Sequence, residues 1–358
     1  MVGDIDVAPL WLRDACSCAD CRDEFSGQRL RGVLSLEPDT SIAEWREDDG
    51  VVEVRFAPDD HVSRFSRAWL EANMPGKAML FDDRSERHRP PWLAADLGGR
   101  PSQVDWEELR TAGDSRAEAL DALMRTGLLL VRHAPTESGM VLTVARSFAY
   151  VRTTNYGDLF DVRVEARPVN LAFTGRAIAP HTDNPYRDPV PGIQLLHCLQ
   201  SSPGGGDNTF IDGFAAAALI RDEDPQAFNT LVSTSLTFRY EDADAVLQAS
   251  GPIIGVNHAG DVRSIRWNDR SIMPPAVPPD EVDEVYRALR VFARTLERPE
   301  LAIHLTLDPG DCIAFDNTRV LHARTAFEGG RGARHLQGCY ADLDALASTI
   351  AVLQRGRP

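Results

Sequence analysis

The chain has 358 residues, 43% of them hydrophobic, which is enough for two or more domains with cores of their own and excludes a disordered protein. Its formal net charge of -16 argues against binding to nucleic acid or an anionic membrane, because phosphate groups are bound by clustered Lys and Arg. The same charge mildly favours a cationic substrate. The sequence has neither the basic and apolar order of a signal peptide nor the roughly 18 apolar residues of a membrane span, so we expect a cytoplasmic protein.

Three of the six cysteines lie close together near the start of the chain, at Cys16, Cys18 and Cys21. A chain of this size with six cysteines does not resemble a disulfide framework, so the cluster favours metal ligation. The alternative is three free thiols on a loop. The other cysteines are scattered among apolar residues, and we expect Cys198 and Cys312 to be buried thiols of the core.

The segment from residue 9 to about residue 91 alternates in short strands, at 32–36 and 51–56, between acidic and glycine-containing turns. This pattern predicts a small β domain, and so small a domain often recruits a structural metal. The polar run 82–87 followed by prolines is the best linker candidate. We therefore predict a small N-terminal domain at 1–95 and a second domain at 96–358.

The second domain begins with a helical pattern at 105–125, a strand at 127–132 and another helix around 137–148. Mostly strand-and-turn sequence follows, interrupted by helical stretches at 214–231 and 279–297. Many short strands with few helices predict a mainly β fold with flanking helices. The expected architecture is a double-stranded β-helix, or jelly roll, whose mouth brings residues from several strand ends together.

Two separated motifs in this domain could supply one metal site. His181 and Asp183 lie two positions apart, so on a strand they face the same side, and a later strand can add His322. Two imidazoles and one carboxylate form the facial ligand set of non-haem Fe(II) oxygenases, which leaves three coordination positions open. The alternatives are a chance His-x-Asp in a loop and a core histidine at 322.

Several longer motifs carry a resemblance to a known family. The chain resembles, over nearly its whole length, the γ-butyrobetaine dioxygenase group of Fe(II)/2-oxoglutarate oxygenases, related to trimethyllysine dioxygenase and more distantly to taurine dioxygenase. The motifs are WLRDACSCADC from Trp11, HVSRFSRAWL from His61, NYGDLFDV from Asn155, NLAF from Asn170, HTDNPY from His181, LLHC from Leu195, GGGDNTFIDGF from Gly204, PGDCIAFDNTRVLHAR from Pro309 and ARHLQGCYADLD from Ala333.

The resemblance implies cofactors and their ligands. Fe(II) would be held by His181, Asp183 and His322, with 2-oxoglutarate and O2 in the open positions. Arg334 matches the family position that binds the far carboxylate of 2-oxoglutarate, a task suited to a guanidinium fork. Two other arginines are close enough in sequence to be confused with it, and we interpret them as solvated or structural loop charges: Arg324 and Arg331.

The resemblance has two further implications, one for the residue that supports 2-oxoglutarate and one for a zinc site. Asn208 stands where relatives place a Ser or Thr that supports 2-oxoglutarate, and Thr209 could take its place. His61 would complete a zinc site with the three clustered cysteines. Three sulfurs and one nitrogen form a closed tetrahedral shell, so this Zn(II) would be structural.

The family enzymes hydroxylate an unactivated carbon near a trimethylammonium group, which aromatic faces attract through cation–π interactions. Phe160 and Phe173 stand where the animal γ-butyrobetaine enzymes carry Trp and Tyr, and those enzymes do not share Tyr186. Asn170 and Asn268 are expected at the anionic end of the substrate. The aromatic candidates are Tyr156, Phe160, Phe173, Tyr186 and Tyr340.

The resemblance favours hydroxylation of γ-butyrobetaine to carnitine by a homodimer that uses Fe(II), 2-oxoglutarate and O2. Within the same chemistry, the alternatives are hydroxylation of 2-trimethylaminoethylphosphonate or of trimethyllysine. Outside catalysis, the alternatives are a small-molecule sensor on the same fold and a zinc-dependent interaction module with an inert oxygenase body.

Overall fold

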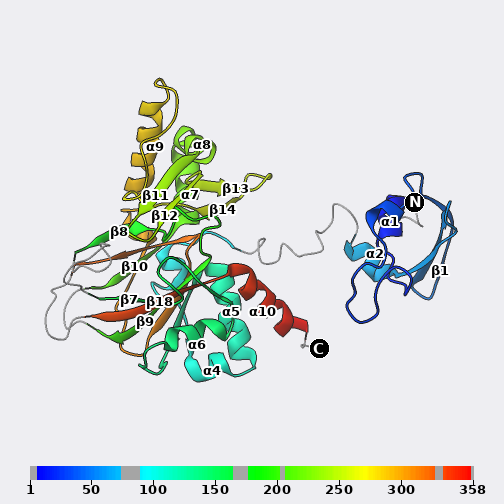
Figure 1. Ribbon diagram of the computed structural model, residues 1–358, viewed down its shortest axis with the longest axis horizontal. Helices are drawn as coiled ribbons and strands as arrows, with labels where there is room; N and C mark the ends of the chain where they lie inside the picture. Colours follow the sequence, from blue (N-terminus) through cyan, green and yellow to red (C-terminus); the bar gives the residue numbers. More distant parts are fainter. Residues whose placement is uncertain (1–5, 74–88, 164–175, 202–205, 327–333, 356–358) are drawn as a thin grey trace. The chain divides into compact units, whose positions relative to one another are not determined.

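The computed structural model describes residues 6–73, 89–163, 176–201, 206–326 and 334–355 (Figure 1). Contacts divide the chain into two compact units, Met1–Arg87 and His88–Pro358. None of the described helices is long and apolar enough to cross a membrane.

The first unit has a three-stranded antiparallel sheet in the order β1-β2-β3. Val52, Val54 and Phe56 alternate along β2 and are fully buried, each stabilising the fold by about 1.5–3 kcal/mol. The elements are α1 (Pro9–Asp14), η1 (Val33–Ser35), β1 (Ser41–Asp48), β2 (Val51–Ala57), β3 (Val62–Ser66) and α2 (Arg67–Asn73).

One predicted strand of this unit is wrong. The segment expected as a strand at 32–36 contains the short 3-10 helix η1, because the Ser35 backbone N–H and hydroxyl both donate to the carbonyl of Gly32. Val33 and Leu34 are therefore exposed instead of packed. The other predicted strand, at 51–56, is confirmed as β2.

The domain boundary lies earlier than the expected position near residue 95. The Trp92 backbone N–H donates to Asp212 Oδ2 at 2.8 Å, and its indole Nε1 donates to the carbonyl of Thr126 at 2.7 Å. Arg319, which is fully buried against Asp212, also donates to the carbonyl of Pro90. The segment 90–92 is therefore bonded into the second unit.

The second unit contains a seven-stranded sheet in the order β4-β5-β16-β9-β18-β6, with β7 also paired to β18. Only the β4–β5 pair is parallel among these described pairs. The strands are β4 (Ser102–Asp105), β5 (Leu128–Arg132), β6 (Val151–Arg152), β7 (Phe160–Val162), β9 (Ile193–Gln200), β16 (Cys312–Asp316) and β18 (His335–Ala341).

Helices cover the outer face of this sheet. Leu120 and Leu123 of α5 and Val144 of α6 pack in one core cluster with Leu195 of β9 and Leu346 of α10. Figure 1 shows α4, α5 and α6 gathered at one end of the second unit. The helices are α4 (Trp106–Arg110), α5 (Asp114–Thr126), α6 (Met140–Arg146) and α10 (Leu343–Arg355).

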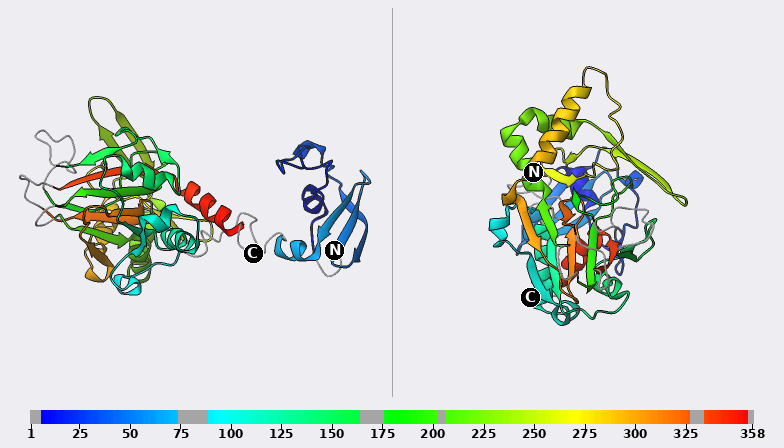
Figure 2. Two further views of the ribbon diagram at one scale, coloured as in Figure 1. Left: turned by 90° about the horizontal axis from the view of Figure 1, so that it is seen from below. Right: turned by 90° about the vertical axis from the view of Figure 1, so that its left-hand side faces the viewer.

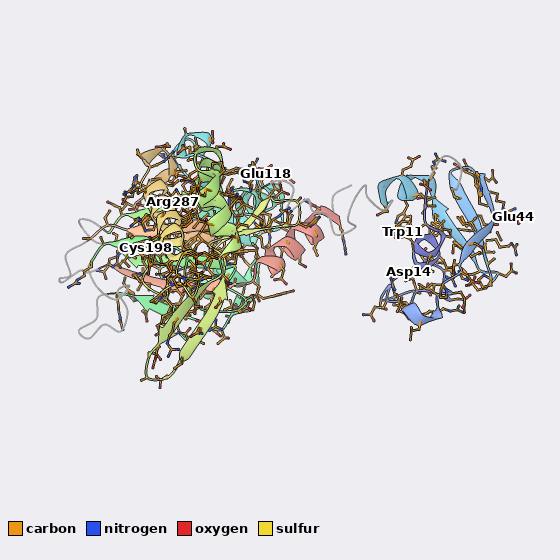
Figure 3. The ribbon with its side chains drawn as sticks, turned by 90° about the horizontal axis from the view of Figure 1, so that it is seen from above. Trp11, Asp14, Glu44, Glu118, Cys198 and Arg287 are labelled. Carbon is orange, nitrogen blue, oxygen red and sulfur yellow. The ribbon has the colours of Figure 1, made fainter. Side chains whose placement is uncertain are left out.

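A four-stranded antiparallel sheet, ordered β15-β10-β17-β8, packs against the inner face (Figure 2). Phe210 of the smaller sheet meets Phe315 of the larger one, with ring centroids 5.4 Å apart. Cys198 and Cys312 are buried as predicted, and Figure 3 shows Cys198 inside the second unit. This mainly β architecture with helices confirms the coarse prediction, and the two facing sheets are consistent with a jelly roll. The strands are β8 (Ile178–His181), β10 (Asn208–Asp212), β15 (Ala302–Leu305) and β17 (Val320–Arg324).

A long insertion between β10 and β15 forms a further layer around Phe238, Trp267 and Phe292. Its helices α7, α8 and α9 lie at the opposite end of the unit from α4 (Figure 1). Arg287 of α9, labelled in Figure 3, donates hydrogen bonds to the carboxylate of Asp224, the residue before α8. The elements are α7 (Gly213–Glu223), α8 (Pro225–Ser233), β11 (Leu236–Glu241), β12 (Val246–Gly251), β13 (Ile254–Val256), β14 (Val262–Ile265) and α9 (Val282–Thr295), with the 3-10 helices η2 (Ala94–Leu97) and η4 (Pro299–Leu301) elsewhere in the unit.

Two predicted helices are each divided in two. The helix expected at 105–125 stops after Arg110 and restarts at Asp114, behind Gly113. The helix expected at 214–231 divides at Asp224, where Pro225 lacks an N–H and the Asp224 carboxylate caps the Ala227 N–H. The helices expected at 137–148 and 279–297 are confirmed, with shorter bounds, as α6 and α9.

Candidate active site

Strand pairing brings the two histidines of the separated motifs together. His322 on β17 pairs with His181 at the end of β8, and their ring centroids lie 4.2 Å apart. Asp183 follows β8, with Oδ1 3.3 Å from His181 Nε2 and Oδ2 3.9 Å from His322 Nε2. His181 Nδ1 contacts the carbonyl of Ala179 at 2.9 Å, which leaves Nε2 facing the cluster. One donor atom from each residue lies within 4.8 Å of the others.

The surroundings of this cluster lower the pKa values of two of its members, His322 and Asp183. Burial, followed by the nearby His181, lowers the pKa of His322 to about 3. Burial by itself would raise the pKa of Asp183, but its interactions with the two histidines and the hydrogen bond from Tyr340 outweigh it, so the pKa lies below its usual range. Neutral imidazoles and an ionised carboxylate are the forms that bind metal cations.

Hydrogen bonds fix the orientation of the Asp183 carboxylate. Its Oδ2 accepts from Gln194 Nε2 at 2.9 Å and from the Tyr340 hydroxyl at 2.8 Å. Its backbone N–H donates to Asn317 Oδ1, and Asn317 Nδ2 returns a bond to its carbonyl. Two donors occupy the lone pairs of Oδ2, so Oδ1, which faces His181 Nε2, is the oxygen left for a cation. Sequence reasoning missed Gln194 and Asn317, since only strand pairing brings them here.

A cavity of about 390 Å³ opens beside the cluster. His181, Asp183 and His322 line it, together with residues from both sheets and from the β11–β12 hairpin. A cavity of this size holds a small organic molecule beside the three donors.

Arg334 and Asn208 meet in this cavity. Arg334 Nη2 donates to Asn208 Oδ1 at 2.7 Å, and both side chains are buried. Burial lowers the pKa of Arg334 to about 10, which still leaves it charged at neutral pH. Thr209 does not line the cavity; its hydroxyl lies 3.1 Å from His304 Nδ1 on the other side of β10, as strand alternation requires.

Arg324 is not a solvated loop charge, contrary to the sequence interpretation. It is 7% exposed on β17, lines the same cavity and donates to the carbonyl of Arg176. Burial and then the neighbouring Arg334 lower its pKa to about 10. The other candidate, Arg331, lies outside the described residues.

Aromatic side chains form one wall of the cavity. The Phe160 ring stacks on Tyr340 with centroids 5.2 Å apart, and Tyr156 lies 6.3 Å from Phe160. Gly338 on β18 makes this packing possible, because a Cβ there would overlap the Phe160 ring. The hydroxyls of Tyr156 and Tyr186 lie 3.2 Å apart. Phe173 and Asn170 lie outside the described residues, so their predicted roles stay predictions.

The hairpin adds a ring that sequence reasoning missed. Tyr240 on β11 stacks on Tyr186 with centroids 5.0 Å apart and meets the edge of Tyr156 at 5.9 Å. The alternation of LTFRYE could indicate a strand but not which cavity its tyrosine faces. The predicted Asn268 is buried and lines the cavity, and the exposed Arg270 nearby was not predicted.

The four predicted donors of the first unit also cluster. His61 Nε2 lies 3.2 Å from Cys16 Sγ and 3.7 Å from the sulfurs of Cys18 and Cys21. A zinc ion bound tetrahedrally would hold sulfur and nitrogen about 3.5 Å apart, so the set fits this metal. The buried Arg13 donates to Cys21 Sγ at 3.3 Å and contributes a positive charge beside the thiols.

Comparisons with known proteins agree with this arrangement. The profile of the family described as "Taurine catabolism dioxygenase TauD, TfdA family" matches residues 87–340. The chain is 35% identical to the γ-butyrobetaine dioxygenase of Pseudomonas sp. (strain AK-1), over 97% of this chain and 90% of that protein. It is 26% identical to the trimethyllysine dioxygenase of Meyerozyma guilliermondii, with the same coverage.

The solved structures agree in fold. A taurine dioxygenase from Burkholderia xenovorans superposes with a TM-score of 0.51 at 17% identity, covering 66% of this chain and 84% of that one. The family profile spans most of the second unit, and the relatives align over nearly the whole chain. The chain therefore belongs to the TauD, TfdA family and is an iron- and 2-oxoglutarate-dependent dioxygenase.

Proposed function

We propose that this enzyme hydroxylates an unactivated carbon of a small trimethylammonium compound, with γ-butyrobetaine as the favoured substrate and carnitine as its product. The single observation that carries the proposal is the aromatic wall directly beside His181, Asp183 and His322 in one cavity. The identity of 35% to a γ-butyrobetaine dioxygenase over nearly the full length supports the choice of substrate.

In this proposal His181 Nε2, Asp183 Oδ1 and His322 Nε2 are the iron ligands. Iron with 2-oxoglutarate and O2 would supply the oxidising chemistry. The contribution of the protein is to keep Asp183 and His322 unprotonated and to fix the direction of all three donors. Gln194 and Tyr340 hold the other oxygen of Asp183, so the carboxylate presents a single oxygen to the ion.

Arg334 is proposed to bind the far carboxylate of 2-oxoglutarate. A buried guanidinium offers two parallel N–H donors to a carboxylate, and its contact with Asn208 fixes the direction of the fork. This contact supports Asn208, rather than Thr209, as the residue that assists 2-oxoglutarate binding. Arg324 adds a second positive charge to the same part of the cavity.

The trimethylammonium group is proposed to bind against Tyr156, Phe160, Tyr186 and Tyr340. A quaternary nitrogen cannot donate ordinary hydrogen bonds, so ring faces and dispersion must hold it. The position of the rings relative to the three donors then decides which carbon lies nearest the reacting oxygen.

A structural Zn(II) is proposed for Cys16, Cys18, Cys21 and His61. The four donors close a tetrahedral shell, and their spacing supports this ion. The homodimer expected from the family resemblance stays a prediction.

Two other substrates use the same chemistry. The trimethyllysine alternative is supported by the relative of that name. The alternative 2-trimethylaminoethylphosphonate is supported by an additional cation in the cavity, Arg270. A sensor or an inert oxygenase body would hydroxylate none of these compounds.

The proposal is tested by a turnover screen of the three compounds with Fe(II), 2-oxoglutarate and O2, read by mass spectrometry. We expect a gain of one oxygen on γ-butyrobetaine, with succinate formed in equal amount. The His181→Ala variant is the matched control and should form neither product. Succinate formation that no quaternary amine stimulates would contradict the proposal, and oxidation of the phosphonate alone would change the substrate but not the reaction.

A further inference from the structure

We infer that Arg270 binds the anionic end of the substrate and thereby selects quaternary ammonium compounds that also carry an acid group. This inference deepens the proposed function and rests on it. Arg270 follows β14 in the segment before α9, and its side chain lines the cavity that contains the three metal-binding candidates.

The charges in the cavity single out this arginine. Arg239 pairs with Glu241 at 2.6 Å, and the buried Arg334 contacts Asn208. Arg270 forms no ion pair with any residue that the structure describes, and its Nε donates to the neutral Asn268 Oδ1 at 3.3 Å. Its guanidinium thus keeps most of its donors for a ligand.

The positive charges near Arg270 favour binding of an anion in this part of the cavity. The charge of Arg270 contributes to lowering the pKa values of both His322 and Arg324, after larger effects of burial. The guanidinium is therefore near both groups, in a part of the cavity with several like charges. A carboxylate or phosphonate beside Arg270 would neutralise this excess of positive charge.

The local backbone holds Arg270 in position. The Ser271 N–H and hydroxyl both donate to the carbonyl of Asn268, so residues 268–271 form a tight turn. The Arg239 N–H donates to the carbonyl of Ser271, which ties this turn to the hairpin that carries Tyr240. The anion site and the aromatic wall are therefore joined by a short, hydrogen-bonded frame.

This frame suits a substrate with two charged ends. Asn268 is buried, whereas Arg270 is exposed, so the guanidinium lies toward the mouth of the cavity. A substrate with its quaternary nitrogen against the aromatic wall would direct its acid group to Arg270. The planar guanidinium donates two parallel hydrogen bonds to a carboxylate or a phosphonate, and the second charge of a phosphonate strengthens the attraction.

The test compares charged and neutral forms of one ligand. γ-Butyrobetaine, its methyl ester and 2-trimethylaminoethylphosphonate are titrated anaerobically into wild-type and Arg270→Met enzyme loaded with Fe(II) and 2-oxoglutarate. Methionine keeps much of the apolar length of the side chain but removes its charge and donors. We expect the affinity for the acid to fall about 10- to 100-fold, as for a lost charge-assisted hydrogen bond, with a larger fall for the phosphonate and no change for the ester.

Arg239→Met is the matched control, because it removes one positive charge from the same cavity at a residue that already has a partner, Glu241. Its effect on acid relative to ester should stay below about 3-fold, because the ion pair with Glu241 already neutralises the charge of Arg239. Affinity for 2-oxoglutarate should be unchanged in the Arg270→Met variant. Equal losses for acid and ester, or no loss for either, would overturn the assignment of Arg270.

A second titration separates this inference from the proposed function. If wild-type enzyme binds no trimethylammonium acid, the proposed substrate class is wrong, but butyrate and ethylphosphonate still probe the anion contact. Binding of these amine-free acids, followed by ligand NMR, should weaken several-fold in Arg270→Met and not in Arg239→Met. Identical binding to wild type and Arg270→Met would refute the inference whatever the substrate proves to be.

Discussion

Each unit of the chain contains one cluster of metal-binding candidates, and the two clusters differ in donors and surroundings. The first has three sulfurs and an imidazole, and the cavity beside it is only about 20 Å³. The second has two imidazoles and one carboxylate beside a cavity of about 390 Å³. Four donors fill a tetrahedral shell, whereas three leave positions for reactants. The number of donors and the space beside them together distinguish a structural site from a reactive one.

The clusters also differ in what supports them. Arg13 donates to a thiol of the first cluster and to Asp59, whose carboxylate accepts the backbone N–H of His61. In the second cluster, Tyr340 donates to Asp183 while its ring contacts Phe160 in the aromatic wall. The contacts of the first cluster hold it within its own unit. The contacts of the second cluster connect it to the aromatic wall of the cavity.

The strongest test of the contrast removes one donor from the open cluster. His181→Ala, Asp183→Ala and His322→Ala should each abolish turnover and tight Fe(II) binding, because each removes one of three protein ligands. Zinc content and fold should persist, as judged by metal analysis and circular dichroism. His304→Ala, at an exposed histidine outside the cavity, is the control. Turnover near the wild-type level in any of the three variants would remove that residue from the cluster.

Removal of a donor from the closed cluster should have the opposite pattern. Cys18→Ser or His61→Ala should release about one zinc per chain and lower the melting temperature, because metal binding at such a site contributes directly to folding free energy. The Fe(II) and 2-oxoglutarate absorption of protein that remains folded should be unchanged. The comparison of the two clusters would fail if purified wild-type protein contained iron alone.

Much of this contrast was readable in the sequence. The spacings of Cys16, Cys18 and Cys21 and of His181 and Asp183 are local patterns, whereas His61 was expected only from the family resemblance. The structure brings the members of each cluster together. Gln194, Asn317, Tyr240 and Arg270 carry no such local pattern. Gln194, Tyr240 and Arg270 reach the cavity, and Asn317 reaches the backbone of Asp183, only through the tertiary fold, which residue spacing does not encode.

The errors in secondary structure have local causes. Asp224 and Pro225 are a recognisable helix stop and start, but the apolar period on either side continues through them. The apolar segment at Val33 resembles a strand, yet it has no neighbouring strand to pair with among the described residues of the first unit. Periodicity reports which face a residue takes, whereas pairing depends on the rest of the fold.

The third prediction concerns the cosubstrate, which only the open cluster needs. Arg334→Lys should weaken 2-oxoglutarate about 10- to 100-fold, because an ammonium cannot reproduce the guanidinium fork or the contact with Asn208. Affinity for the amine substrate should change much less. Anaerobic titration of the Fe(II) enzyme gives both constants. If Arg324→Lys lowers the affinity for 2-oxoglutarate and Arg334→Lys does not, the far carboxylate is bound by Arg324 and not by Arg334.

The fourth prediction tests the contact that joins the open cluster to the aromatic wall. Tyr340→Phe keeps the ring that stacks on Phe160 but removes the hydroxyl that donates to Asp183. Fe(II) affinity should fall about 10-fold, as for other contacts behind a metal ligand. Binding of the quaternary amine should change little. Phe160→Leu should show the reverse pattern, and identical behaviour of the two variants would contradict this division of roles.

The last prediction concerns stability alone and a buried histidine that belongs to neither cluster. His197 on β9 is fully buried, and neither ring nitrogen has a hydrogen-bond partner among the described residues. Burial lowers the pKa of His197 to about 4. The unfolded chain therefore takes up the proton first, near its ordinary pKa of about 6.5, while the folded protein keeps the ring neutral.

The free energy of unfolding should consequently be highest above about pH 6.5 and fall as the pH drops toward 4, by up to about 3 kcal/mol from this residue. His197→Met fills similar space without a titrating group, so the difference in stability between variant and wild type should grow over that pH range. Urea unfolding at several pH values measures this difference. A constant difference would mean that His197 accepts its proton in the folded protein as easily as in the unfolded chain, so that burial without a metal does not by itself suppress protonation here.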